Sequence, residues 1–352
     1  MLLTSFMEVF KNMKSKSLKT FVQVVVGVLL FVMMVLYASK VLERKDAYVK
    51  YEAFFREKND FDVLFFGSSN MQLMVNPLQL WNECGITSYN FGNTSERLPV
   101  TYWTIKNALE YTSPKVVVIE ISQYGQEEKY KDMYSVHLAW DRFPISLTKI
   151  KAVYDVLSPS DPRYELLFDM ILYHDRWKEL TPTDFSKDYS KSMGYATSHE
   201  YTAFERPEYE FRIDEAAPKT EGVMYLEKTV EELQEKGIQV VFVHSPEVNS
   251  EEKQARINAA SVTAEKYNIP LIDFTVMKDS VVDYATDLSD ADHANIQGAT
   301  KLTHYIGEYL MSNYDLKSHA GDASYNDWNT FYEDYRAEND GVPMTVKEEE
   351  EE

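Results

Sequence analysis

Two short motifs bring together the residue types that acyl transfer through a serine requires. The first is DVLFFGSSN, an apolar run from Asp62 that stops at Gly67 and presents Ser69 at the following turn. The backbone N–H groups of such a turn lie close to the hydroxyl and can hold an oxyanion. Because Gly-Ser-Ser is also an ordinary turn, this motif alone is weak evidence for a nucleophile.

The second motif is DLSDADHANIQG, which begins at Asp287 and carries Asp290 and His293 three residues apart. A carboxylate at this spacing can hold one imidazole nitrogen, which leaves the other nitrogen free to take a proton from a serine. Asn295 is expected to cap the helix that follows. The alternatives are a capping aspartate beside a surface histidine, or a metal site that also uses Asp287 and Asp292.

Apolar runs alternate with amphipathic stretches along the chain and predict the elements that position these motifs. The runs cover residues 62–66, 86–91, 116–121, 238–243 and 269–274, and helices are expected within 102–111, 223–235 and 252–267. Near-continuous apolar runs suit parallel strands buried on both faces. We therefore expect a flavodoxin-like, three-layer α/β fold with a five-stranded parallel sheet. The serine follows the first strand and the D-x-x-H the last, so both should lie at the carboxyl edge.

In these positions the chain resembles the SGNH (GDSL-type) hydrolase superfamily. The nucleophile of that superfamily lies in a Gly-Asp-Ser block and its base in a C-terminal D-x-x-H block. Gly67-Ser68-Ser69 matches the first block with Ser68 in the Asp position, and Asp290-Ala-Asp-His293 matches the last. The resemblance implies Ser69 as nucleophile, His293 as base and Asp290 as its partner, with no cofactor and no metal.

The middle blocks match less well. Asn90-Phe-Gly92-Asn93 resembles the second block, whose glycine donates an oxyanion N–H, so the resemblance implies an oxyanion hole formed by the amides of Ser69 and Gly92. A plain turn at Gly92 is the alternative. The third block has Glu-Ile-Ser-Gln-Tyr (120–124) where the family carries an oxyanion Asn, with only Ser122 or Gln123 as substitute donors.

Three further residues are candidate substrate contacts: Asn70 beside the nucleophile, Asn93 after the second strand, and His244 at the end of the fourth. Asn70 as a residue that starts the helix and His244 as a buried strand-end histidine are the alternatives. Aromatic, His and Arg residues gather at 137–142 and 173–177. This composition suits sugar binding and also a helical cap that packs on itself.

The GSS block and the missing Asn resemble a narrower group: membrane-anchored SGNH proteins of bacterial envelopes, similar to those of teichoic-acid D-alanylation and alginate O-acetylation. This resemblance implies acyl transfer or removal on a cell-envelope polymer or glycan, beside a multipass membrane O-acyltransferase. A non-catalytic polymer-binding or scaffold protein is the alternative. Loss of one oxyanion donor lowers a rate by about a hundred- to a thousand-fold, which argues against a fast general esterase.

An apolar run from Phe21 to Ala38 is long enough to cross a membrane. Lysines precede it, so the positive-inside rule predicts a cytoplasmic N-terminus and an extracytoplasmic domain. A cleaved signal peptide is the alternative, although Leu36-Tyr-Ala lacks the small first residue of a typical cleavage site. The expected organisation is a cytoplasmic 1–19, a transmembrane anchor 20–39, a stem 40–59, an SGNH-like domain 60–315 and a tail.

The SGNH-like domain is expected to contain a helical insertion at about 126–217, and the acidic tail 316–352 is expected to be weakly ordered.

The composition of the chain excludes two further features. The 352-residue chain has a net charge of −21, which argues against nucleic-acid binding. Cys84 is the only cysteine, so an intramolecular disulfide is impossible.

Overall fold

The computed structural model describes residues 15–43, 45–57, 60–185 and 189–347. The chain divides into two compact units, which are described separately. The larger unit comprises Asp46–Leu167 and Asp188–Glu352, and the smaller joins the N-terminal segment up to Lys45 to Phe168–Lys187.

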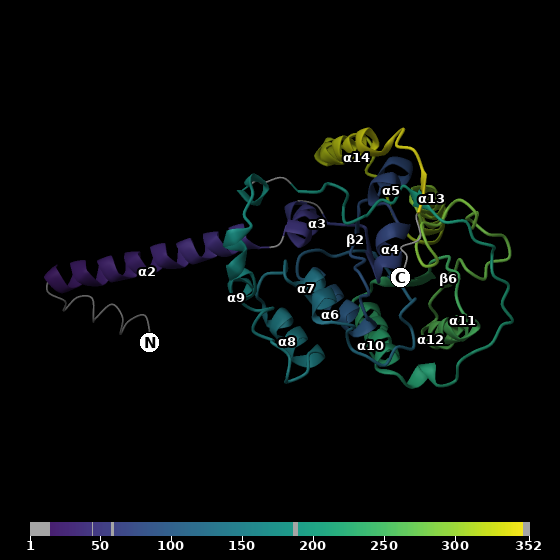
Figure 1. Cartoon of the computed structure of the whole chain (residues 1–352), viewed down its shortest axis with the longest axis horizontal. Coiled ribbons are helices and arrows are strands. Elements are labelled where there is room, and N and C mark those ends of the chain that lie inside the picture. Colours follow the sequence, from purple (N-terminus) through teal and green to yellow (C-terminus); the bar gives the residue numbers. More distant parts are fainter. Residues whose placement is uncertain (1–14, 44, 58–59, 186–188, 348–352) are drawn as a thin grey trace. The chain divides into compact units, whose positions relative to one another are not determined.

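A five-stranded parallel sheet lies inside the larger unit (Figure 1). Its strands are β1 (Val63–Phe66), β2 (Ser88–Asn90), β3 (Val116–Glu120), β5 (Gln239–His244) and β6 (Leu271–Asp273). They run in the order β2-β1-β3-β5-β6, which is the 2-1-3-4-5 order of flavodoxin-like folds. The predicted fold class and all five predicted strands are therefore confirmed.

Side chains of each buried strand alternate between two separate cores. In β1, Leu64 and Phe66 face one core, whereas Val63 and Phe65 face the other. Every residue of β1 and β3 is buried. Because successive side chains of a strand point to opposite faces, only a continuous apolar run fills both cores.

Helices cover both faces of the sheet and make it the middle of three layers (Figure 1). One core includes residues of α6 (Leu98–Ala108), α10 (Glu221–Glu235), α11 (Glu251–Asn258) and α12 (Ala260–Tyr267). The other includes residues of α4 (Ser69–Met74) and α13 (Ile296–Asn313), while α5 (Pro77–Cys84) contributes to both. The helix expected within 252–267 is thus two helices, α11 and α12.

The predicted stem is largely a helix of the larger unit, which corrects that prediction. Helix α3 (Lys45–Arg56) buries Tyr51 and Phe54, and the Phe54 ring stacks on Phe61 at 5.5 Å between centroids. The aromatic residues recur at helical spacing within a charged stretch, so one face of α3 joins the core. Residues 58 and 59 of the predicted stem lie outside the described residues.

The predicted helical insertion is helical only in its first half. Helices α7 (Met133–Trp140) and α8 (Leu147–Val156) pack with α6 around a small core of their own. Trp140 is buried there and His137 pairs with Asp141, which matches the alternative of a cap that packs on itself. Beyond residue 189 the chain is mainly extended as far as η3 (Ala217–Lys219), apart from β4 (Glu200–Tyr201). Its N–H groups bond to loop carbonyls there, for example that of Thr202 to Leu288.

The tail predicted to be weakly ordered folds onto the larger unit as far as it is described. It contains η4 (Ala323–Tyr325), α14 (Asn326–Asn339) and β7 (Thr345–Val346), which pairs with β4. Trp328 is only 1% exposed, packs on Trp81 at 5.6 Å between ring centroids and donates to Glu57 at 3.0 Å. Phe331, Tyr332 and Tyr335 pack against the same core, so the aromatic face of α14 holds this otherwise polar helix and the prediction is wrong. Residues 348–352 lie outside the described residues.

The smaller unit contains one long apolar helix, α2 (Ser15–Leu42). A segment of 26 residues, Ser17–Leu42, is long and apolar enough to cross a membrane, and its most apolar stretch is not buried by protein. A signal sequence would satisfy the same criteria. The unit also holds α9 (Asp169–Tyr173), η1 (His174–Lys178) and η2 (Pro182–Phe185). Most of the predicted cytoplasmic segment, residues 1–14, lies outside the described residues.

The position of Trp328 predicts that α14 contributes to the stability of the larger unit. Trp328→Ala should lower the free energy of unfolding by about 3–5 kcal/mol, because it leaves a cavity beside Trp81. Denaturant unfolding of the full-length protein in detergent measures this change. Phe211→Ala is the matched control, since Phe211 is 72% exposed, and should change stability by less than about 0.5 kcal/mol. Equal effects of both variants would contradict the packing of α14.

Candidate active site

Ser69, His293 and Asp290 lie together at the carboxyl edge of the sheet. The Ser69 Oγ is 2.8 Å from His293 Nε2, and His293 Nδ1 is 2.8 Å from Asp290 Oδ1. The side chains of His293 and Asp290 are 23% and 33% exposed, so a substrate can reach them. In this arrangement the imidazole can take the serine proton while the carboxylate fixes its tautomer and orientation. The three residues predicted from the two motifs are thus brought together.

Gly67 and Ser68 determine where the nucleophile points. Gly67 has a φ of +154°, and a Cβ there would lie 2.6 Å from the Glu120 Cβ, so only glycine fits between the ends of β1 and β3. Ser68 is the N-cap of α4, which makes Ser69 the first residue of that helix. The N–H groups of a first helical turn have no partner within the helix. The oxyanion role of the Ser69 amide stays a prediction.

A narrow loop carries Asp290 and His293. Leu288 and Ala294 form an antiparallel bridge, and the Ser289 N–H donates to the His293 carbonyl at 2.9 Å. Asn295 then caps α13, because its Oδ1 accepts two backbone N–H groups of the first turn. The predicted cap is confirmed, and the loop is held at both ends.

The electrostatics of the loop favour an ionised Asp290 and a basic His293. Burial would raise the pKa of Asp290, but the hydrogen bond and charge of His293 hold it well below its usual range. Lys347 Nζ, 2.9 Å from Asp290 Oδ2, acts in the same direction. Burial would lower the pKa of His293, but the Asp290 carboxylate raises it, with smaller contributions from Asp292 and Glu247. His293 therefore stays protonated to a higher pH than an ordinary histidine.

The second block supports the nucleophile loop and offers no free glycine amide. The Gly92 N–H donates to Asn90 Oδ1 at 2.9 Å, which contradicts the predicted role of Gly92 as an oxyanion donor. A side chain at this position would clash with α4, because a Cβ at Gly92 would lie 2.4 Å from the Gln72 nitrogen. Asn90 Nδ2 in turn donates to the carbonyls of Met71 and Val75, each at 2.8 Å.

The substitute donors of the third block are also bonded within the protein. The Ser122 N–H donates to Glu120 Oε1 at 2.6 Å, and its Oγ donates to Glu120 Oε2 at 2.8 Å. The Gln123 side chain accepts from Arg97 and donates to Ser122 Oγ at 3.3 Å. Neither substitute donor of the third block is therefore free to hold an oxyanion in this structure.

The three predicted substrate contacts are buried, which contradicts those roles. Asn70, Asn93 and His244 are 5%, 3% and 0% exposed. Asn93 Nδ2 donates to Tyr51 at 2.7 Å and to Glu96 at 2.9 Å, so its amide is used inside the protein. Spacing along the sequence placed His244 at the end of a strand and Asn70 and Asn93 in the segments after strands correctly, but it carries no information on what covers them.

Asn70 instead joins the two catalytic loops. Its Nδ2 donates to the Asp292 carbonyl, next to His293, at 2.7 Å, and also to Glu247 Oε1. Its Oδ1 accepts from Ser68 Oγ at 2.7 Å. This carboxamide therefore connects the nucleophile loop directly to the histidine loop.

A buried charged cluster lies beneath this bridge and was missed by the sequence analysis. His244 Nδ1 is 3.5 Å from Glu120 Oε1, and His244 Nε2 is 3.8 Å from Glu247 Oε2. Lys253 Nζ is 2.7 Å from the same Glu247 oxygen and 2.9 Å from Asp292 Oδ1. The available signal was a glutamate directly after an apolar strand, at Glu120, and another three residues after His244.

Protonation of His244 offsets part of the negative charge of the cluster. Burial would lower the pKa of His244, but three carboxylates, of Glu247, Asp273 and Glu120, outweigh this effect and raise the pKa to about 9. Burial also raises the pKa of Glu247. An unpaired buried charge is strongly destabilising, so the positive charges of His244 and Lys253 complement the two buried glutamates.

Glu120, His244 and Glu247 are also the described residues whose donor atoms come close enough to hold a metal ion, within 4.8 Å of one another. The Glu120 oxygens already accept hydrogen bonds from Ser122, and Glu247 is paired with Lys253. A protonated imidazole fits between these carboxylates as well as a cation would. We therefore assign the cluster no metal.

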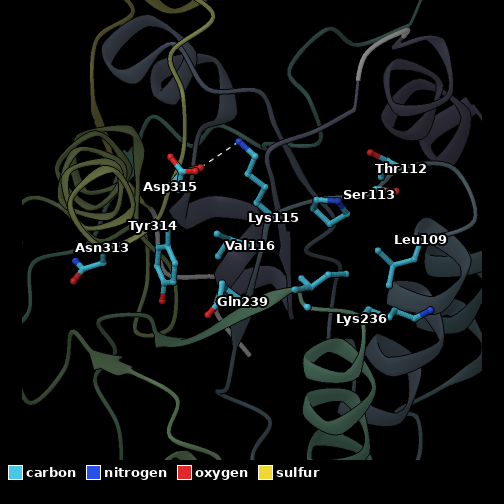
Figure 2. A pocket seen from close by; sticks show the side chains of 13 residues that line it. Leu109, Thr112, Ser113, Lys115, Val116, Lys236, Gln239, Asn313, Tyr314 and Asp315 are labelled. Carbon is cyan, nitrogen blue, oxygen red and sulfur yellow. Dashed lines mark hydrogen bonds between the residues drawn. The ribbon is translucent and has the colours of Figure 1, made fainter.

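A groove of about 720 Å³ lies at the other edge of the sheet and is separate from the triad (Figure 2). Lys115 and Val116 begin β3 on one side of it, and Gln239 begins β5. Lys115 Nζ donates across the groove to the Asp315 carbonyl at 3.2 Å. Ligands of doubly wound sheets bind at the carboxyl ends of the strands, so we place the site at the triad and not in this groove.

Comparison with known proteins finds partial structural similarity to hydrolases. A protein from Desulfitobacterium hafniense described as lipolytic and of the G-D-S-L family is 13% identical over 70% of this chain and 98% of that chain, with a TM-score of 0.38. A GDSL-like lipase from Bacteroides thetaiotaomicron is 10% identical over 72% and 88%, with a TM-score of 0.37. An acetyl xylan esterase from Butyrivibrio proteoclasticus is 7% identical over 73% and 65%, with a TM-score of 0.30. No family model and no curated protein matches the chain.

The raised pKa of His293 predicts a shifted pH profile. Because the base must be neutral, activity should rise with pH and reach half its maximum above the ordinary histidine pKa of about 6.5. Asp290→Asn removes the carboxylate that raises this pKa, so the midpoint should move to lower pH while the maximal rate falls. The pH dependence of reaction with a fluorophosphonate probe measures both quantities. An unchanged midpoint would contradict the coupling of the pair.

The bridge through Asn70 predicts a positioning role. Asn70→Ala should slow reaction of Ser69 with the probe and lower the free energy of unfolding by about 1–3 kcal/mol, because Glu247 loses a buried partner. Asn258→Ala is the matched control, since Asn258 is a buried asparagine of α11 that donates to the Arg212 carbonyl at 2.9 Å. The control should lose stability without losing reactivity, and an equal loss of reactivity in both variants would reject the positioning role.

Proposed function

We propose that the chain is an SGNH-type serine esterase or acyltransferase that acts on O-acyl groups of a cell-envelope polymer. The proposal is supported above all by the hydrogen-bonded series from Ser69 Oγ through His293 to Asp290 at the carboxyl edge of the sheet. A nucleophile, a base and a carboxylate that orients the base are the groups that a serine acyl-enzyme mechanism needs. The matching first and last sequence blocks support the same assignment.

In the first half-reaction, Ser69 Oγ attacks the acyl carbon of an ester while its proton passes to His293 Nε2. Asp290 accepts the hydrogen bond from Nδ1 and stabilises the imidazolium that forms. The ester C–O bond then breaks, and the leaving oxygen takes the proton from His293. The products are the free alcohol and an acyl group bound to Ser69.

In the second half-reaction, the acyl group leaves Ser69 for an oxygen nucleophile. His293 removes the proton of that nucleophile and later returns a proton to Ser69 Oγ. A sugar or polyol hydroxyl gives transfer, and water gives hydrolysis. The internal bonds of Gly92, Ser122 and Gln123 leave the Ser69 amide as the remaining predicted oxyanion donor, so we expect slow chemistry on a bound acceptor and not rapid hydrolysis of soluble esters.

We assign the enzyme to the cell membrane, with α2 as a single-pass anchor. The support is the length and apolarity of Ser17–Leu42, together with the lysines that precede the apolar run. This orientation puts the N-terminus in the cytoplasm and the catalytic domain outside it. A multipass membrane O-acyltransferase that exports the acyl group is the partner that such a transferase requires.

Loss of the nucleophile tests the mechanism. Full-length protein in detergent should be labelled covalently by a fluorophosphonate, and Ser69→Ala should abolish the label. Ser261→Ala, which replaces a part-buried serine of α12 that bonds to the Asn258 carbonyl, should be labelled like the parent protein. Label that persists in Ser69→Ala would show a different nucleophile. With an acylated donor, product analysis with and without an acceptor glycan separates transfer from hydrolysis.

A non-catalytic scaffold that binds the polymer is the second candidate. The missing third-block Asn favours it, because the oxyanion hole has fewer free donors than the family pattern provides. The two functions make opposite predictions for Ser69→Ala in cells. A scaffold keeps acylation of the polymer in this variant, whereas an enzyme keeps polymer binding but loses acylation.

A further inference from the structure

Four large apolar side chains of the smaller unit are exposed although they lie within one short segment. Phe168, Ile171, Trp177 and Phe185 are 56%, 48%, 64% and 59% exposed, and we call them the apolar cluster. Large exposed apolar groups that gather in one place commonly mark an interaction surface. None of the four belongs to the catalytic machinery described above.

The segment that carries the apolar cluster is fastened to the end of α2. Helices α9, η1 and η2 all pack against α2 within this unit (Figure 1). Arg176 donates to the carbonyls of Leu42, the last residue of α2, and of Glu43, and its other nitrogen is 2.8 Å from Asp184 Oδ1. These bonds satisfy carbonyls at the C-terminal end of the helix, so the segment and the helix end are held as one body.

The part of α2 that is covered by protein indicates how deep in a bilayer the segment with the apolar cluster would lie. Residues 20–34 of α2 are all exposed, partial burial begins at Val35, and Leu42 is buried. The bilayer core takes about 20 apolar residues of a helix, so a span that begins near Phe21 ends close to Lys40. The segment therefore lies where the apolar run gives way to polar residues. Tyr37, which is 66% exposed, belongs to the same level.

The chemistry of the segment suits the interface of a bilayer and does not depend on anionic lipid. Trp, Tyr and Phe are enriched at the level of lipid headgroups, where an apolar ring meets a polar layer. Among the exposed charges beside the apolar cluster, Asp175 and Lys178 pair with each other at 3.1 Å, and Glu179 adds a negative charge. The chain as a whole is strongly acidic, with a net charge of −21, so attraction to anionic headgroups is not available to it.

We propose that the apolar cluster inserts into the interface of the membrane that α2 spans, as a second point of attachment with lipid as its partner. The proposal rests on the proposed anchoring by α2 and extends it to residues that are far away in the sequence. Continuity with the apolar surface of α2 selects lipid over a protein partner. Insertion should therefore occur in vesicles that contain no other protein.

Depth-dependent quenching of a fluorescent label tests this inference on the full-length protein. A Cys84→Ser background leaves no native cysteine, and an environment-sensitive fluorophore is then attached at Trp177→Cys or, independently, at Ile171→Cys. The protein is reconstituted in phosphatidylcholine vesicles with spin labels placed either near the headgroup or at the end of the acyl chain. Leu30→Cys in α2 reports the span, and Phe211→Cys, on an exposed residue of the larger unit, reports water.

Labels at 177 and 171 should lose most of their emission to the headgroup-level quencher, less to the deep quencher, and should be blue-shifted relative to the label at 211. The label at 30 should be quenched best by the deep quencher. Quenching at 30 with water-like emission at both 177 and 171 overturns the inference and leaves the anchor intact, which would give the apolar cluster to a protein partner. Water-like emission at all positions overturns the anchor and this inference together. Phosphatidylglycerol in the vesicles should not increase the quenching.

Discussion

The side-chain amide of Asn70 is the contact on which the candidate active site depends. Ser69 and His293 are 224 residues apart in the sequence, yet their reactive atoms are 2.8 Å apart. Asn70 follows the nucleophile and donates to the carbonyl of Asp292, which precedes the base. A small error in this spacing would remove the hydrogen bond that activates the serine, so the asparagine next to a nucleophile here serves alignment and not substrate recognition.

The alignment of Ser69 with His293 depends in turn on charged side chains that are buried in the fold. Glu120 and His244 end two neighbouring strands. The Glu247 carboxylate accepts a hydrogen bond from the Asn70 amide and forms an ion pair with Lys253. Apolar side chains at these positions would pack equally well but would not direct the Asn70 amide. The third block thus carries a buried carboxylate, that of Glu120, which accepts hydrogen bonds from Ser122 and supports the loop.

Sequence reasoning was accurate where a motif coincided with a strand end and failed where contacts were non-local. Ser69 and His293 could be predicted because each motif adjoins a strongly patterned element. The burial of His244 depends on Glu120 and Glu247, and the bond of the Gly92 amide depends on the rotamer of Asn90, which no spacing rule reveals. The fold of the tail escaped prediction because its high average polarity outweighed the helical spacing of its aromatic residues, which are Trp328, Phe331, Tyr332 and Tyr335.

The pairing of β7 with β4 has a consequence for the order of folding. Lys347 reaches Asp290 from the strand pair Thr345–Glu200, so a contact of the catalytic carboxylate forms only after the chain has been made almost to its last described residue. The strands of the sheet, the nucleophile and the base all precede this pair in the sequence. A newly made molecule can therefore form its sheet before Lys347 reaches Asp290.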